Sequence, residues 1–357
     1  MSDSTLIIAE AGVNHNGSIE LALGLVDCAA AAGADVVKFQ TFKAASLATE
    51  RAAKATYQVT NTQQQGSQLA MLRQLELSAK DHARLAEHCR VRGIRFMSTA
   101  FDAESLSLLS TLDMPAIKVP SGDITAGPLL LQAARLRRPI IVSTGMSTLG
   151  DIERALGVLA FGLSVDREPS GQADFDLAYQ SASGRAALEK HVTLLHCTTQ
   201  YPTPPGAVNL RAMDTMRAAF HLPVGYSDHT LGIDVAIAAV ARGATVIEKH
   251  VTLDRALPGP DHAASLEPSE LARLVQGIRT VEAALGGSAK WPAPEELPNR
   301  ALARRSLVVT RPVSRGETFT PDLLGAKRPG TGRSPLDYWS VLGQVASRDY
   351  TVDEAID

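Results

Sequence analysis

Two segments of the chain end a strand-like apolar run with a histidine. They are GYSDHTLG, with His229, and ATVIEKH, with His250. If these runs are consecutive strands of a parallel barrel, the two imidazoles converge about one strand spacing apart. Neutral imidazoles suit a borderline divalent ion such as Mn²⁺ or Zn²⁺. Taken alone, such a pair is more often structural than metal-binding, so the interpretation depends on the residues that accompany it.

Polar side chains with other chemistry follow the remaining apolar runs. The basic and hydroxyl-bearing ones suit a phosphate or a carboxylate, and they are Lys38, Thr99, Lys118, Ser121, Ser143 and Ser227. The candidate bases or hydroxyl clamps are Glu10, Asp123 and Glu248. Other polar residues at these positions include Gln40, Thr199 and Tyr201. One serine alone would usually be a turn or a helix cap, but polar residues at every strand end together favour a catalytic site.

The scaffold that must position these residues alternates short apolar runs with Ala- and Leu-rich segments. The expected strands are Leu6–Glu10, Asp35–Gln40, Arg95–Thr99, Ala116–Pro120, Pro139–Ser143, Val192–Cys197, Val224–Tyr226 and Ala244–His250. Helical segments such as Ile19–Ala32 and Ala79–Arg92 are each followed by a glycine, a usual helix end. The pattern predicts a (β/α)8 TIM barrel with its active face at the carboxyl ends of the strands. A doubly wound open sheet is the competing fold, but it would concentrate its chemistry at one switch point.

The chain changes character after the eighth unit. The Pro-rich stretch Trp291–Pro298 predicts a linker, and short strand- and turn-like segments follow it. We therefore expect a catalytic barrel over residues 1–285, a linker over 286–299 and a small α+β or mostly β domain over 300–357. Two stretches interrupt the barrel pattern. Ala48–Leu72 is expected to be a polar surface or lid loop, and Gly162–Lys190 is an acidic and polar insertion without assigned chemistry.

Composition limits the class of protein. The 357 residues are 45% hydrophobic and 20% charged with a net charge of −3, which suits a globular enzyme and predicts no nucleic-acid or membrane partner. Cys28, Cys89 and Cys197 have no CxxC spacing, which predicts a reducing, cytoplasmic setting without a disulfide framework. The sequence predicts neither a secretion signal nor a membrane span.

Common nucleotide and nucleophile motifs do not occur in the sequence. We find no Walker loop, no GxGxxG that opens a helix and no Ser-His-Asp elbow. Cys197 lies in the apolar run LLHCTT and is predicted to pack rather than to act as a nucleophile. The remaining interpretation is a site for a small, doubly anionic phosphate ester, a polyhydroxyl second substrate and one divalent ion.

The sequence resembles the sialic acid synthase family, which makes nonulosonic acids such as N-acetylneuraminate. The matching stretches run in order over nearly the whole chain: IIAEAGVNHNGS, VKFQTFKAASL, STAFD, IKVPSGD, IVSTGM, LLHCTTQYPTP, VGYSDHTLG, IEKHVTLD, PGPDHAASLEP and KRPGTG. The tail resembles the antifreeze-like (SAF, β-clip) domain that accompanies these synthases.

The resemblance implies condensation of phosphoenolpyruvate with an N-acetylated hexosamine, with release of phosphate. N-acetylmannosamine would give N-acetylneuraminate, and 2,4-diacetamido-2,4,6-trideoxymannose would give N,N′-diacetyllegionaminate. The implied catalytic residues are Glu10, Lys118, Asp123 and Glu248. The implied phosphoenolpyruvate contacts are Lys38, Thr99, Lys118, Ser121, Ser143 and Ser227, with Thr199 at the phosphate side. The implied sugar contacts are Glu10, Gln40, Tyr201, Asp261 and Arg328.

The resemblance further implies a metal ion and a partner subunit. His229 and His250 would hold Mn²⁺, with Mg²⁺ or Co²⁺ as alternatives. Arg328 would reach the active site of the other subunit in a domain-swapped homodimer. The chain departs from the family at Asp123, where many bacterial members have Glu, and at Thr199, where some have Asn.

Two other classes of protein compete with this interpretation. A 3-deoxy-octulosonate or deoxyheptulosonate phosphate synthase would need a second phosphate site for its sugar, and the strand ends carry no spare Lys/Arg cluster. A non-catalytic protein that binds ice or glycan through its C-terminal domain would not need the catalytic-looking barrel.

Overall fold

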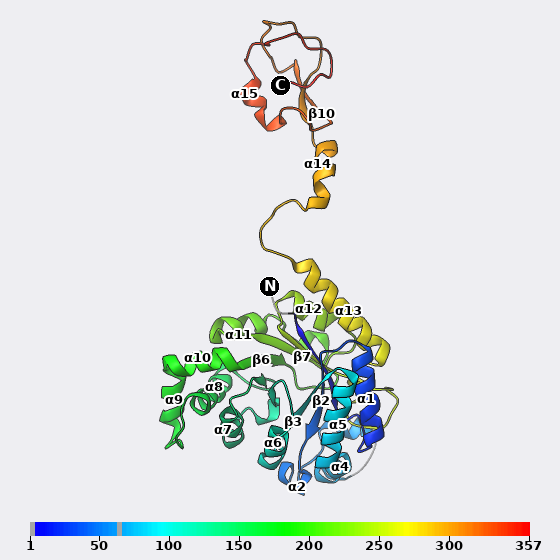
Figure 1. Cartoon of the computed structure of the whole chain (residues 1–357), viewed down its shortest axis with the longest axis vertical. Helices are drawn as coiled ribbons and strands as arrows, with labels where there is room; N and C mark the ends of the chain where they lie inside the picture. Colours follow the sequence, from blue (N-terminus) through cyan, green and yellow to red (C-terminus); the bar gives the residue numbers. More distant parts are fainter. Residues whose placement is uncertain (1–3, 63–65) are drawn as a thin grey trace. The chain divides into compact units, whose positions relative to one another are not determined.

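Eight parallel strands close into a barrel in which sequence neighbours are also spatial neighbours (Figure 1). The computed structural model describes residues 4–62 and 66–357. The strands are β1 Leu6–Gly12, β2 Val36–Thr41, β3 Arg95–Ala100, β4 Ile117–Val119, β5 Ile140–Ser143, β6 Val192–Cys197, β7 Val224–Asp228 and β8 Val246–His250. The barrel closes because β1 pairs with β8, from Leu6 opposite Val246 to Glu10 opposite His250. The predicted TIM barrel is confirmed, and the doubly wound sheet is excluded.

Helices surround the barrel, and most of them cover the outer face of its strands (Figure 1). They are α1 Ile19–Ala31, α2 Ala44–Leu47, α3 Thr56–Thr62, α4 Gln68–Leu75, α5 Ala79–Arg92, α6 Ala103–Ser110, α7 Gly127–Arg135, α8 Leu149–Ser164, α9 Gln172–Gln180, α10 Ala182–His191, α11 Ala212–Phe220, α12 Asp234–Ala241 and α13 Pro268–Leu285. Local sequence explains their ends. For example, α5 begins with a capping box between Ser78 and Asp81 and ends at Gly93, whose φ of 72° is left-handed.

The barrel core combines the outward side chains of the strands with the inner faces of the helices. Strands β2, β5, β7 and β8 are buried over almost their whole length. Parallel strands covered by helices are expected to be apolar on their outer face, and buried Val, Ile and Leu residues form that layer here. The inner face of the barrel is therefore free to carry polar groups at the carboxyl ends of its strands.

One sequence expectation for the barrel was wrong. Ala48–Leu72 is not a plain loop, because it contains α3 and the start of α4; residues 63–65 lie outside the described residues. Helix α4 forms because Ser67 caps it and because Met71 and Leu75, four residues apart, are buried on one face. The insertion Gly162–Lys190 begins inside α8 and continues as α9 and α10, so it extends the helical layer.

The second compact unit comprises Gly287–Asp357. Its elements are η4 Pro294–Glu296, α14 Leu297–Ala303, β9 Ser306–Val309, β10 Leu324–Lys327, η5 Pro335–Asp337 and α15 Tyr338–Val341. Strands β9 and β10 are antiparallel, and the unit has its own core that includes Leu307, Phe319 and Tyr350. Helix α14 runs across the expected boundary at residue 300, and the exact boundaries of the domains stay a prediction.

A membrane-spanning helix was not expected. In the two described ranges, none of the helices combines the length and the apolar character needed to cross a bilayer.

Candidate active site

The carboxyl ends of the strands surround a cavity of about 390 Å³. Its volume is in the range of small-molecule sites. The predicted site residues that line it are Glu10, Lys38, Gln40, Thr99, Lys118, Ser121, Ser143, Thr199, Tyr201, Ser227, His229, Glu248, His250 and Asp261. They converge because alternate residues of a strand share one face, as do Lys38 and Gln40 on β2 and Glu248 and His250 on β8.

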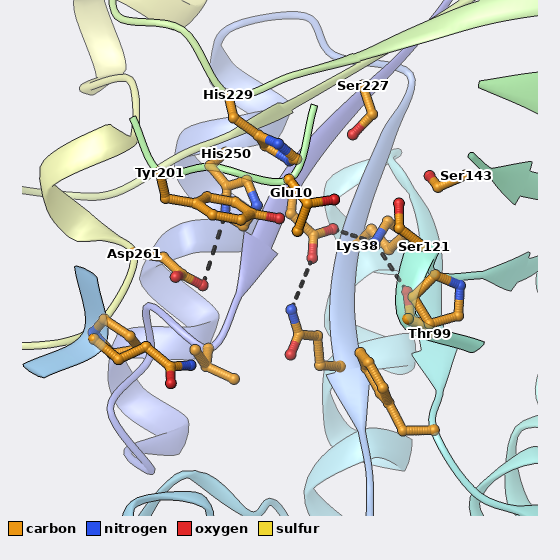
Figure 2. Close-up of a pocket in the computed structure, with 18 of the residues that line it drawn as sticks. Glu10, Lys38, Thr99, Ser121, Ser143, Tyr201, Ser227, His229, His250 and Asp261 are labelled. Atoms are coloured by element: carbon orange, nitrogen blue, oxygen red, sulfur yellow. Dashed lines mark hydrogen bonds and ion pairs between the residues drawn. The ribbon is translucent and has the colours of Figure 1, made fainter. Parts of the chain in front are cut away.

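The cavity has two chemically different sides, with Glu10 between them (Figure 2). One side presents His229, His250, Tyr201 and Asp261, and the other presents Lys38, Thr99, Ser121, Ser143 and Ser227. A phosphate ester and a metal-bound carbonyl compound would therefore meet near Glu10.

Two buried lysines and two buried carboxylates form one network at the bottom of the cavity. Lys38 Nζ lies 2.5 Å from Glu10 Oε2 and 3.5 Å from Glu248 Oε2, and it donates to Thr99 Oγ1 at 2.9 Å. Lys118 Nζ lies 3.2 Å from Glu248 Oε1. Ser227 Oγ donates to the same oxygen at 2.9 Å. The two positive and two negative charges balance one another without a substrate, which lowers the cost of burying both lysines.

The same network separates the proton affinities of the two carboxylates. Burial raises the pKa of Glu10 to about 7, even though Lys38 opposes the shift. Burial would also raise the pKa of Glu248, but Lys118 and Lys38 together hold it well below its usual range. Glu248 is therefore ionised at neutral pH, while Glu10 titrates close to it. Carboxylates with separated pKa values are typical of acid–base sites.

Hydroxyl groups on β5 and after β4 are available to an anion. Ser143 Oγ is buried and has no hydrogen-bond partner among the described residues. Ser121 Oγ accepts from the Gly145 amide at 3.0 Å. The backbone comes very close here, because a Cβ on Gly145 would lie 2.2 Å from Thr199 Oγ1. A buried, unsatisfied hydroxyl is unfavourable unless a ligand pairs with it.

The two histidines lie together beside Tyr201. Their ring centroids are 5.5 Å apart, and the Tyr201 ring is 4.0 Å from that of His229. His229 Nδ1 lies 2.7 Å from the Thr198 carbonyl. Because a carbonyl only accepts, Nδ1 carries a hydrogen, and in the neutral ring Nε2 is the nitrogen with the lone pair. Burial lowers the pKa of His229, but Cys197 and the hydrogen bond to Thr198 outweigh burial and raise it. Hydrogen bonding of one ring nitrogen is how proteins orient a metal-binding histidine.

His250 also fits a metal ligand. Burial, followed by the charges of His229 and Lys38, holds the pKa of His250 well below its usual range, so the ring is neutral. Its Nδ1 is buried, 4.0 Å from Asp261 Oδ2, and no hydrogen-bond partner for it occurs in the described part of the chain. Within residues 4–62 and 66–357, no group of three or more His, Cys, Asp and Glu side chains could hold a metal ion. An ion at the histidine pair would therefore need further ligands from substrate or water.

Two predicted site residues do not line the cavity. Asp123 belongs to the 3-10 turn η1 Ser121–Asp123, and this turn leaves only Ser121 and Gly122 of the segment at the cavity. Burial, followed by Asp102, raises the pKa of Asp123 to about 6. Arg328 lies in the second unit, where its side chain is exposed and its Nε donates to the Ala303 carbonyl at 2.8 Å.

The cavity also contains residues that the sequence did not single out. Polar ones are Tyr57 and Gln58 of α3 and Gln68 of α4. Apolar ones are Val13, Leu47, Met71, Leu72, Leu75 and Phe101. The Tyr57 and Tyr201 rings are 5.0 Å apart, and Asn61 Nδ2 donates to the Pro260 carbonyl at 2.6 Å. Ser67 as a cap, followed by Met71 and Leu75 four residues apart, was the available signal for α4.

Fold and site together define a TIM-barrel enzyme with an anion-binding side and a histidine pair. The chain belongs to the NeuB family, whose model matches residues 25–290, and residues 304–356 match the SAF domain. The predicted family and C-terminal domain are thereby confirmed.

Individual relatives agree with this assignment. The N,N′-diacetyllegionaminic acid synthase of Campylobacter jejuni is 46% identical over 99% of this chain and 98% of its own length. The synthase of the same name from Legionella pneumophila is 45% identical over 97% of this chain and 91% of its own length. The N-acetylneuraminic acid synthetase structure from Leptospira borgpetersenii, in complex with citrate, has 32% identity and a TM-score of 0.67, and the match covers 83% of this chain and 90% of that one. The chain is therefore an enzyme of the nonulosonic acid synthase type.

Proposed function

We propose that this enzyme condenses phosphoenolpyruvate with an N-acylated hexosamine, giving a nine-carbon 2-keto sugar acid and phosphate. The observation that carries the proposal is the convergence in one cavity, around Glu10, of two lysines, a histidine pair and a serine hydroxyl that has no partner in the described part of the chain. Such a cavity suits a small dianionic ester on one side and a carbonyl compound on the other.

Phosphoenolpyruvate would occupy the basic and hydroxyl-bearing side. Lys38 and Lys118 would neutralise its phosphate and carboxylate. Ser143 would donate the hydrogen bond that its buried Oγ lacks among the described residues, and Ser121, Thr99, Thr199 and Ser227 would orient the ester. Binding of the anion would draw the lysines partly away from Glu10 and Glu248, which frees these carboxylates to act on the second substrate.

The reaction then joins C3 of phosphoenolpyruvate to the aldehyde carbon of the open-chain sugar. Water adds at C2, and the tetrahedral intermediate loses phosphate by cleavage of its C–O bond. Glu10 lies beside Lys38 and within 3.5 Å of Gln40, so it would position the sugar hydroxyls and transfer a proton. Glu248 and Lys118, which also line the cavity, are the other candidates for proton transfer.

A divalent ion at His229 and His250 would polarise the aldehyde as a Lewis acid. Two observations support a metal ion at this pair. Nδ1 of His250 has no hydrogen-bond partner among the described residues, and the Thr198 carbonyl orients the ring of His229. We propose Mn²⁺, with Mg²⁺ or Co²⁺ as alternatives, because two imidazoles with oxygen ligands suit such ions.

The acceptor is proposed to carry no phosphate. Among the described residues, Lys38 and Lys118 are the only Lys or Arg side chains that line the cavity, and phosphoenolpyruvate uses both. This argues against a deoxyheptulosonate- or octulosonate-type sugar phosphate.

One observation favours the diacetamido sugar over N-acetylmannosamine. Phe101 lies two residues beyond Thr99, and Met71 and Leu72 belong to α4, which follows β2. These apolar residues of the cavity lining therefore lie nearer to the mouth of the barrel than Lys38 and Thr99 do. The 6-deoxy sugar presents a methyl group there, whereas N-acetylmannosamine presents a hydroxymethyl group.

The test is release of phosphate from phosphoenolpyruvate, with Mn²⁺, in the presence of each sugar separately. The two sugars differ at C4, acetamido against hydroxyl, and at C6, methyl against hydroxymethyl. We expect kcat/KM to be higher for 2,4-diacetamido-2,4,6-trideoxymannose, by about 10- to 200-fold from the C6 difference alone. An equal or higher kcat/KM for N-acetylmannosamine would instead identify the enzyme as an N-acetylneuraminate synthase. No phosphate release with either sugar would contradict the proposed reaction.

A further inference from the structure

A buried ion pair that the proposed reaction does not use lies directly behind the two histidines. Lys249 Nζ lies 2.7 Å from Asp228 Oδ2 and donates to the Thr230 carbonyl at 2.5 Å. The two side chains are 1% and 0% exposed, respectively. Neither residue lines the cavity, because each points to the opposite face of its strand from the neighbouring histidine.

The pair connects β7 and β8, at whose ends the two histidines lie, and its two residues are directly opposite each other. Asp228 of β7 is opposite Lys249 of β8, and each immediately precedes its histidine in the sequence. The ion pair therefore joins the strand ends one residue below the two imidazoles.

The same network also closes around the backbone of His229. Asp228 Oδ1 accepts from the Thr230 amide at 2.9 Å and from the Tyr226 hydroxyl at 3.2 Å. Lys249 holds the carbonyl of Thr230. Asp228, just before His229, thus binds the amide of Thr230, just after it. Lys249, just before His250, binds both Asp228 and the Thr230 carbonyl.

Stability is a weak explanation for such a pair. Removing two charges from water is so unfavourable that a buried ion pair is often no more stabilising than apolar residues of similar volume. What the pair does provide is direction, because its hydrogen bonds fix one arrangement of the two strand ends. Metal sites depend on such outer contacts, whose loss typically weakens binding about 10- to 100-fold.

We propose that Asp228 and Lys249 are positioning residues that hold the imidazoles of His229 and His250 at the separation a divalent ion requires. This inference rests on the proposed role of the two histidines as metal ligands. It adds a specific claim: the ion pair acts on metal affinity through the backbone and does not touch the ion or the substrates.

The experiment measures Mn²⁺ binding to the full-length protein without substrates, by electron paramagnetic resonance of the free ion. The main variant combines Asp228→Asn with Lys249→Met, which removes both charges together and leaves neither one buried alone. We expect its Kd for Mn²⁺ to rise about 10- to 100-fold. A Kd equal to that of the wild type would overturn the inference.

A second variant covers the case in which the double variant does not fold. Asp228→Glu keeps the charge but lengthens the side chain by one methylene, so the pair can form only with a shift of the strand ends. We expect weaker Mn²⁺ binding here as well, and unchanged binding in a folded Asp228→Glu protein would overturn the inference.

The matched control is the ion pair between Asp35 and Arg279, with 2.8 Å between Asp35 Oδ2 and Arg279 Nη2. It lies at the amino ends of the strands, because Asp35 immediately precedes β2. Asp35→Asn should lower the unfolding temperature without changing Mn²⁺ affinity. If the wild type binds Mn²⁺ no more tightly than His250→Ala does, the proposed metal site itself is wrong, and the inference is overturned with it.

Discussion

Lys118 is the residue on which the proposed phosphoenolpyruvate subsite depends most. It is 4% exposed and forms an ion pair with Glu248, which the charges of Lys118 and Lys38 keep ionised in spite of burial. Lys118→Met keeps the volume and removes one charged hydrogen-bond donor. We expect kcat/KM for phosphoenolpyruvate to fall, with a loss of transition-state stabilisation on the order of 2–4 kcal/mol.

The control for this change is Lys43→Met. Lys43 pairs with Glu76 at 3.4 Å near the surface, so its loss should leave the kinetics nearly unchanged. An unaltered KM and kcat in Lys118→Met would remove Lys118 from the subsite.

Glu10 should set the acid side of the pH profile. Its pKa is raised to about 7, so the carboxylate form that accepts hydrogen bonds from the sugar hydroxyls is lost as the pH falls through that value. We expect kcat/KM for the sugar to decrease below about pH 7. In Glu10→Gln the activity should be low and should lack this acid limb; the same limb in the variant would assign it to another group.

At the level of single residues, strand alternation explains which predictions succeeded. A strand-end residue and the one two positions away share a face, so Lys38, Gln40, Glu248 and His250 could be placed from the sequence alone. Tyr57 and Met71 could not, because they lie in a segment that belongs to no strand and so has no register with the barrel. Asp123 was misplaced because a 3-10 turn after β4 interrupts the alternation.

Among the elements, β7 approaches both of its neighbours closely at Gly225. A Cβ on Gly225 would lie 2.4 Å from the Val246 carbonyl oxygen and 2.7 Å from Leu195 Cδ2. Gly225→Ala must therefore push β7 away from β6 or β8, and we expect a loss of about 1–3 kcal/mol in the free energy of unfolding. Urea denaturation measures it. Gly127→Ala, where a Cβ would meet nothing within 4 Å, is the control and should change it little.

Elements with a clear period were predictable and irregular ones were not. The eight apolar runs predicted the strand ends to within about two residues. Helices cover the outer face of these strands, so their sequences are nearly continuous apolar runs. The polar composition of Ala48–Leu72 hid α3 and α4. Helix α3 has no buried residue, and α4 buries only Leu69, Met71 and Leu75 rather than a full apolar stripe.

For the whole molecule, the domain-swapped homodimer that the family resemblance implies would make the C-terminal unit part of catalysis. We propose that Arg328 of one chain contacts the sugar in the barrel of its partner; its exposed guanidinium, bound to a backbone carbonyl through Nε, is suited to such a contact. Co-expressed His250→Ala and Arg328→Ala chains, each inactive alone, should then regain activity, because one barrel of the mixed dimer has both residues. No recovery in isolated mixed dimers would mean that Arg328 acts on its own barrel or not at all.

The central claim is that the enzyme forms a C–C bond and releases phosphate by C–O cleavage. Phosphoenolpyruvate labelled with ¹⁸O at the bridging oxygen tests this claim directly, with the diacetamido sugar and Mn²⁺ present. Mass spectrometry of the released phosphate should find the label there, in a one-to-one ratio to a product that is heavier than the sugar by the three-carbon unit. Unlabelled phosphate, or labelled phosphate without the nine-carbon product, would contradict the account.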